Sequence, residues 1–169
     1  MFVQKVAVKC IIEEKGKVLL IKEGKRSSWR PGTWALPGGK MDEGENLLES
    51  LARELKEETG LKVRIKGLYR VEEIVAEVNY ERRLVHHFVF IGDRLSGSLR
   101  EPDDSVAEIK WISKKDLTAI KVNDLAEFYY PTLFEEYIKN PNKIIELSKV
   151  KIWDQKTNKK FSSWIKLTQ

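Results

Sequence analysis

Three glutamates on one predicted helix, Glu54, Glu57 and Glu58, have a spacing that could do chemistry. Positions i, i+3 and i+4 spread them over roughly 100° of a helix with ~3.6 residues per turn. Their like charges repel one another, and the negative end of the helix dipole adds to that repulsion. A solvated acidic face with Arg53 and Lys56 as local partners would explain the pattern without a ligand. A divalent cation such as Mg²⁺ would explain it by binding carboxylates together with substrate phosphates.

The stretch from Gly39 to Leu61 contains the predicted helix that must position these glutamates. Its leucines recur at spacings of three and four, which gives the helix one apolar face for burial. Gly60 stands where a helix commonly ends in a left-handed cap. Gly38 and Gly39 precede the helix, and their lack of a side chain would let the backbone come close to a metal ion and a diphosphate.

The complete stretch from Gly39 to Leu61 resembles the Nudix box at every defined position. It reads Gly39, five residues, Glu45, seven residues, and then Arg53-Glu54-Leu55-x-Glu57-Glu58-x-Gly60-Leu61. The resemblance to Nudix hydrolases, rather than the helix geometry, is what favours the metal interpretation. It implies a three-layer α/β/α sandwich with a mixed β-sheet and the box helix packed on one side, over about residues 3–138. Mixed strands with two helical regions also favour this fold class.

The resemblance also implies a role for each matching residue. Glu57 and Glu58 would be the main metal ligands, helped by the carbonyl oxygen of Gly39. Glu54 would be a further ligand or would orient the attacking water, and Arg53 would position Glu54. The expected cofactor is Mg²⁺, with Mn²⁺ as an alternative ion. Such ions polarise phosphoryl oxygens and lower the pKa of bound water.

The general base is expected on an acidic loop that follows the box in the sequence. Glu101, Asp103, Asp104 and Glu108 are candidates, and Glu101 is the favoured one. Burial of several carboxylates without metal raises their pKa values. We therefore expect activity to rise toward alkaline pH and to vanish with a chelator.

Substrate-binding residues are predicted outside the box. Trp29, flanked by Arg26 and Arg30, could stack on a base and neutralise phosphate charge, although a half-buried anchor tryptophan would explain the loop equally well. Tyr80 lies nineteen residues after Leu61, near the position of a tyrosine in some dinucleoside-polyphosphate hydrolases. Some ADP-ribose-directed relatives carry a proline near the position of Ala76.

The resemblance implies a Mg²⁺-dependent hydrolase that cleaves a diphosphate linkage in a nucleoside diphosphate derivative. The leading substrate class is a nucleoside triphosphate or a related nucleotide. ADP-ribose and dinucleoside polyphosphates remain alternatives. A non-catalytic nucleotide- or RNA-binding module is a further alternative, and an isoprenoid-type isomerase ranks low because its relatives modify the box.

Composition indicates one soluble domain over residues 1–169, with a core at about 3–138 and a basic extension at 139–169. Hydrophobic residues make up 41% of the chain and charged residues 34%. No apolar run approaches the ~18 residues of a spanning helix, so a cytoplasmic protein without a membrane partner is expected. The net charge of +5 matches the excess of seven lysines over two acidic residues between positions 142 and 169. This extension leaves nucleic-acid contact open without favouring it, and a homodimer is also left open.

Apolar alternation and short apolar runs predict strands at residues 3–12, 18–21, 33–36, 62–66, 68–77, 82–91 and 105–112. Residues 3–12 and 18–21 are expected to form a hairpin whose second strand is buried on both faces. Ser113 is expected to cap a helix, and residues 122–139 to be helical with a kink or a new start at Pro131. Residues 150–153 and 161–167 are expected to form a hairpin. His86 and His87 must face opposite sides of their strand, so they are interpreted as polar strand residues rather than ligands of one metal.

Overall fold

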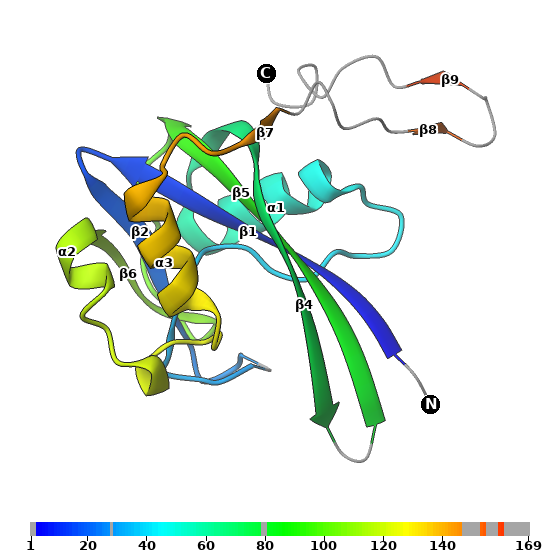
Figure 1. Ribbon diagram of the computed structural model, residues 1–169, viewed down its shortest axis with the longest axis horizontal. Coiled ribbons are helices and arrows are strands. Elements are labelled where there is room, and N and C mark those ends of the chain that lie inside the picture. Colours follow the sequence, from blue (N-terminus) through cyan, green and yellow to red (C-terminus); the bar gives the residue numbers. More distant parts are fainter. Residues whose placement is uncertain (1–2, 28, 79–80, 147–152, 155–158, 161–169) are drawn as a thin grey trace.

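A mixed β-sheet lies between two helical layers (Figure 1). The computed structural model describes residues 3–27, 29–78, 81–146, 153–154 and 159–160. The sheet runs in the order β3-β2-β1-β5-β4-β7, with β6 paired to β2. β1 and β5 are parallel, and the other pairs are antiparallel. The strands are β1 (Val3–Glu14), β2 (Lys17–Glu23), β3 (Trp34–Ala35), β4 (Lys62–Val78), β5 (Glu81–Ser96), β6 (Val106–Ser113) and β7 (Ile145–Glu146).

The helical elements are α1 (Leu47–Thr59), α2 (Lys114–Leu117), the 3₁₀ turn η1 (Val122–Asp124) and α3 (Tyr130–Lys139). Strands β8 (Trp153–Asp154) and β9 (Lys159–Lys160) pair with each other. This pairing is compatible with the expected C-terminal hairpin, but residues 150–152 and 161–167 of that prediction lie outside the described residues.

Two apolar cores, one on each face of the sheet, confirm the expected α/β/α sandwich. Val8, Cys10 and Ile12 of β1 pack on the side of α1, where they meet its buried leucines. Ile11 packs on the opposite side, in the core that contains Tyr130, Leu133, Phe134 and Tyr137 from the α3 region. Because successive residues of a strand face opposite sides of a sheet, β1 contributes to both layers.

Helix α1 begins and ends with defined caps. The Asn46 side chain accepts hydrogen bonds from the backbone N–H groups of Leu48 and Glu49, and the Glu49 side chain accepts one from the Asn46 N–H. This reciprocal pair is a capping box. Gly60 ends the helix with φ 77°, which confirms the left-handed cap expected there.

Three elements differ from the sequence-based expectation. Residues 62–66 and 68–77 form one strand, because register shifts on either side of Gly67 let the pairing with β5 continue. β5 continues beyond Ile91 to Ser96, because Gly92 still pairs with Ile65 of β4. Residues 122–129 are not the predicted helix and contain only the 3₁₀ turn η1. The new helix start predicted at Pro131 is confirmed, because α3 begins at Tyr130 and the missing N–H of Pro131 costs no hydrogen bond in its first turn.

No helix in the described part of the chain is long and apolar enough to cross a membrane.

Replacing Gly60 with alanine should destabilise the fold more than the same change at Gly16. Both glycines have left-handed φ angles, 77° and 75°, which cost other residues about 1–2 kcal/mol. A Cβ on Gly60 would also lie 2.5 Å from the carbonyl oxygen of Ser98, whereas one on Gly16 would meet nothing within 4 Å. We therefore expect Gly60→Ala to lower the free energy of unfolding, measured in urea, by ~1–3 kcal/mol more than Gly16→Ala does. Equal losses in the two variants would show that Ser98 does not constrain this cap.

Candidate active site

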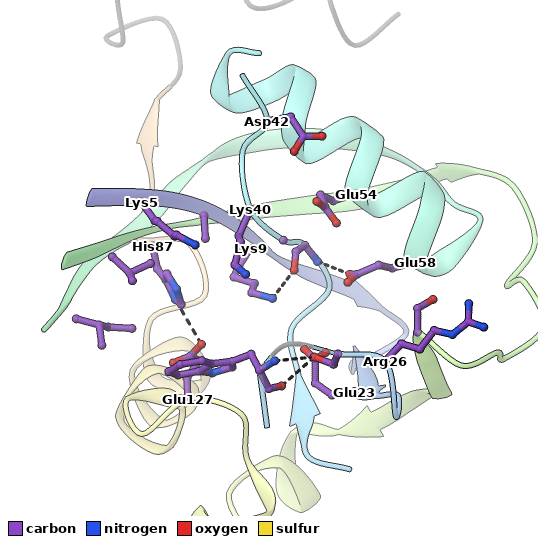
Figure 2. Close-up of a pocket in the computed structure, with 18 residues that line it drawn as sticks. Lys5, Lys9, Glu23, Arg26, Lys40, Asp42, Glu54, Glu58, His87 and Glu127 are labelled. Carbon is purple, nitrogen blue, oxygen red and sulfur yellow. Dashed lines mark hydrogen bonds and ion pairs between the residues drawn. The ribbon is translucent and has the colours of Figure 1, made fainter. Parts of the chain in front are cut away.

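A pocket of about 360 Å³ opens where β1, β5, α1, the loop after β2 and the segment before α3 meet (Figure 2). Glu54 and Glu58 of α1 lie on one side of it. His87 of β5 and Glu127 lie on the other side, and Lys9 of β1 lies between the two sides. The pocket therefore joins two groups of titratable side chains that are far apart in the sequence.

The turn before α1 is held against β1 by its backbone. The N–H groups of Val8 and Cys10 donate to the carbonyl oxygens of Gly39 and Pro37, both at 2.9 Å, and Met41 donates back to β1. This pairing brings the turn to the side of β1 that faces away from β5. A Cβ on Gly39 would lie 2.5 Å from a carboxylate oxygen of Glu54. Any side chain at Gly39 would fill the space between the turn and the helix.

Burial raises the pKa values of both pocket carboxylates on α1. The pKa of Glu58 rises to about 7 because its carboxylate is desolvated, although Lys9 and the Gly38 N–H partly oppose this effect. That N–H donates to Oε2 of Glu58 at 2.6 Å. Desolvation also raises the pKa of Glu54, while the guanidinium of Arg53 lowers it. The site therefore holds carboxylates that are expensive to ionise without a cation.

Arg53 ties the helix to the turn before it. Its Nε donates to Glu45 at 2.7 Å, and its Nη1 donates to Glu54 at 2.8 Å. Its Nη2 donates to the carbonyl oxygen of Lys40 at 3.1 Å. Glu57 lies 3.3 Å from the same guanidinium; its side chain is 61% exposed and does not line the pocket. Arg53 thus fixes the position of Glu54, whereas Glu57 points toward solvent.

The donors at this end of the pocket fit a hard divalent cation. Glu54 and Glu58 offer carboxylate oxygens, and the space beside Gly39 is free of a side chain. Mg²⁺ commonly takes one or two carboxylates and completes its shell with water and substrate phosphates. Within the described residues, no three acidic, histidine or cysteine side chains converge closely enough to hold a metal ion. Glu57, the other carboxylate predicted to be a main metal ligand, would join Glu54 and Glu58 only after release from Arg53.

The structure does not bring the candidate bases of the acidic loop into the pocket. Glu101 is exposed and does not line it. Oδ1 of Asp103 accepts two backbone hydrogen bonds within its own turn, and the nearby Arg100 holds its pKa well below the usual range. Asp104 pairs with two cations of the loop after β2, and Glu108 pairs with Lys22 on β2.

Trp29 and Arg30 attach the loop after β2 to the segment before α3. The indole N–H of Trp29 donates to the carbonyl oxygen of Ala126 at 3.1 Å. The guanidinium of Arg30 donates to the carbonyl oxygen of Leu125 at 2.7 Å and lies 5.0 Å from the ring centre of Phe128. Trp29 lines the pocket, whereas Arg30 does not.

Of the other two residues predicted to bind substrate, Arg26 lines the pocket and Tyr80 lies outside the described residues.

His87 and Glu127 lie in the part of the pocket opposite α1. Glu127 is 4% exposed, and burial raises its pKa to about 7. Burial, together with the charge of Lys9, lowers the pKa of His87 to about 4, so its ring is neutral at pH 7. Nδ1 of His87 lies 2.9 Å from the hydroxyl oxygen of Tyr129 and 3.9 Å from Oε1 of Glu127. His86 faces the other side of β5, as alternation requires, and lies 3.2 Å from Glu73.

Sequence reasoning missed Lys9 and Glu127. Lys9 left a weak signal, because it is a charged residue between Ala7 and Ile11 on one face of the strand predicted at residues 3–12. Glu127 gave almost no signal in the sequence, because it lies in an aromatic stretch that was predicted to be a helix. His87 was considered and interpreted as a polar strand residue, yet it lines the pocket.

Comparison with known proteins identifies the family. A model of the NUDIX domain matches residues 2–134. The protein named "8-oxo-dGDP phosphatase NUDT18" of Danio rerio is 32% identical over 134 residues, which are 78% of this chain and 38% of that protein. The "ADP-ribose pyrophosphatase" of Methanocaldococcus jannaschii is 41% identical over 100 residues, or 59% of this chain and 57% of that protein. This chain thus spans less than two thirds of either relative.

Among solved structures, the MutT protein of Methanosarcina mazei has a TM-score of 0.68 at 27% identity. The alignment covers 83% of this chain and 97% of that one. The family model spans most of the sequence, and its residues include the turn, the box helix and the pocket described above. The chain belongs to the NUDIX domain family.

Proposed function

We propose that this protein hydrolyses the diphosphate linkage of a nucleoside triphosphate or a related nucleotide. The observation that carries this proposal is one pocket with carboxylates at one end and an aromatic, titratable end opposite. Glu54 and Glu58 suit a cation that neutralises phosphate charge. Trp29, His87 and Glu127 suit a nucleobase, since they offer an aromatic surface and polar groups whose charge is suppressed by burial.

The size of the pocket favours a substrate with one nucleoside. Its volume of about 360 Å³ is near the lower limit of ~300–1,000 Å³ for ligand pockets. One base, a sugar and a short phosphate chain suit this space better than two nucleosides. ADP-ribose remains the alternative substrate, because the relative from Methanocaldococcus jannaschii is named as an ADP-ribose pyrophosphatase.

Mg²⁺ is the proposed cofactor, since members of this family generally use divalent metal ions and these donors are hard oxygens. Glu54, Glu58 and the Gly39 carbonyl oxygen would hold it, joined by Glu57 once that side chain leaves Arg53. Bound there, the ion would polarise phosphoryl oxygens and activate water. Arg53 would hold Glu54 in place for this task.

Glu54 is also the carboxylate that we assign to orienting the attacking water. It lines the pocket, and its pKa is raised by burial, so it can accept a proton more readily than an ordinary glutamate. Glu101, favoured from the sequence, is exposed and lies outside the pocket lining.

A Mg²⁺-dependent screen of nucleoside triphosphates, diphosphates, ADP-ribose and dinucleoside polyphosphates tests the proposal. We expect turnover of a substrate with one nucleoside and loss of all turnover with a chelator. Glu58→Gln should lower kcat/KM by roughly 10²–10⁴-fold, whereas Glu101→Gln should stay within a few-fold of wild type. A loss of that size in Glu101→Gln would instead assign the general base to the acidic loop. A loss of only a few-fold in Glu58→Gln would overturn the metal assignment. RNA binding that depends strongly on salt, without turnover, would favour the non-catalytic module.

The affinity for Mg²⁺ should weaken as the pH falls below 7. The pKa of Glu58 is about 7 in the folded protein, and a protonated carboxyl cannot act as a metal ligand. From pH 8 to pH 6 we therefore expect the dissociation constant, measured by calorimetry without substrate, to rise about tenfold. A constant affinity over this range would exclude Glu58 as a ligand.

Glu127→Gln should stabilise the metal-free protein at pH 8 but not at pH 4. Glu127 has a folded-state pKa of about 7 and an unfolded-state value near 4.5, so folding at pH 8 buries a charge. The variant should then gain on the order of 3 kcal/mol in the free energy of unfolding. The gain should disappear below pH 4.5, where the carboxyl is protonated in both states.

Glu135→Gln, at an exposed position of α3, is the matched control for this measurement. It should change stability little at either pH. A gain for Glu127→Gln that persisted unchanged at pH 4 would mean that the buried charge is not its source.

A further inference from the structure

Lys9 is a buried lysine that the proposed chemistry does not yet use. β1 carries Lys5, Ala7 and Lys9 at every second position, so the three side chains share one face, and all three line the pocket. Two residues further on, Ile11 enters the apolar core. Lys9 is 8% exposed and is therefore the cation that lies deepest in this row. The small side chain of Ala7 leaves the floor of the pocket open beside it.

The ammonium of Lys9 is only partly satisfied by the protein. Its Nζ donates a hydrogen bond to the carbonyl oxygen of Gly38. Within the part of the chain that the structure describes, no carboxylate oxygen lies within 4.0 Å of this Nζ, and Gly38 is its one hydrogen-bond acceptor. A lysine ammonium has three N–H donors. The carboxylates of Glu54, Glu58 and Glu127 feel its charge but form no ion pair with it. A buried cation held in this way is costly, so an anion bound in the pocket would stabilise it.

The position of Lys9 indicates which anion this is. It lies between the carboxylates of α1 and the pair formed by His87 and Glu127 (Figure 2). Its charge acts on both groups: it lowers the pKa values of Glu54 and Glu58 at the α1 end and those of Glu127 and His87 at the other. A nucleotide that spans the pocket would place its innermost phosphate between the metal end and the base end.

We propose that Lys9 binds the phosphoryl group nearest the nucleoside, using the N–H donors that Gly38 leaves free. Gly38 fixes the direction of the ammonium from one side, and the pocket gives the phosphate access from the other. This inference rests on the proposed function, since it assumes that a nucleotide occupies the pocket. It adds a residue outside the Nudix box that would hold the nucleoside phosphate whichever phosphate is released.

The alternative is that Lys9 acts only as a structural clamp on Gly38. The two roles differ in what the loss of the charge does. A clamp stabilises the fold, so its removal lowers the unfolding temperature. A phosphate-binding cation also provides affinity for phosphate, so its removal abolishes the gain that a phosphate gives to nucleoside binding.

Ligand binding in excess EDTA tests the proposal without metal or turnover. The probes are dGMP, AMP, their nucleosides without phosphate, and inorganic phosphate, each titrated into the full chain. In the wild type we expect the phosphate to add roughly 10- to 100-fold to nucleoside affinity, as a charge-assisted hydrogen bond would. In Lys9→Met this gain should vanish while nucleoside affinity stays the same. Lys9→Arg, which keeps the charge, should recover part of it.

Lys110→Met, at an exposed position of β6, is the matched control and should bind like the wild type. A phosphate gain that persists in Lys9→Met would overturn the proposal, as would a lower unfolding temperature with unchanged phosphate affinity. Failure of the proposed function looks different. A protein that turns over no nucleotide, yet binds inorganic phosphate through Lys9, would keep the anion site and lose the enzymatic assignment.

Discussion

The close contact between the Gly38–Gly39 turn and its two neighbours is the constraint on which the site depends. On one side the turn pairs with β1 through backbone hydrogen bonds of 2.9 Å at Val8 and Cys10. On the other side Gly38 donates to Glu58, and Gly39 leaves no room for a side chain next to Glu54. The turn therefore sets the distance between a central strand and the box helix. The carboxylates of α1 are held at the pocket because the sheet and the helix are both fixed to this one segment.

β1 connects the fold to the site in a second way. One face of this strand is apolar along the part that packs on α1. Its other face changes character along its length, from Lys5, Ala7 and Lys9 in the pocket to Ile11 in the core beneath α3. The pocket thus begins where the apolar core ends on the same face of the same strand. The packed core therefore fixes the strand whose side chains line the floor of the pocket.

The box helix, its left-handed cap and the principal strands could be predicted because their signals are local. Leucine spacing, a glycine at a helix end and apolar alternation each act over a few residues. The extension of β5 past Gly92 could not be seen, because it depends on pairing with β4 rather than on the residues themselves. His87 and Glu127 come together in the pocket from positions that are forty residues apart, so no spacing along the chain predicts their contact. The favoured base, Glu101, failed to enter the pocket for the same reason: the path of its loop is set by tertiary contacts, such as that of Arg100 with Thr59.

The charges of the groups in the pocket also follow from its geometry. Burial pushes Glu58 and Glu127 toward their neutral forms near pH 7 and keeps His87 neutral, while Lys9 opposes the protonation of both acids. The protein thus encloses a few groups whose charges are only partly compensated internally. A divalent cation at the α1 end would favour ionised carboxylates there. A phosphate at Lys9 would supply the ion-pair partner that this lysine lacks among the described residues. Each ligand would then improve the site for the other, because the cation and the phosphate attract each other across the space that the Gly38–Gly39 turn keeps open.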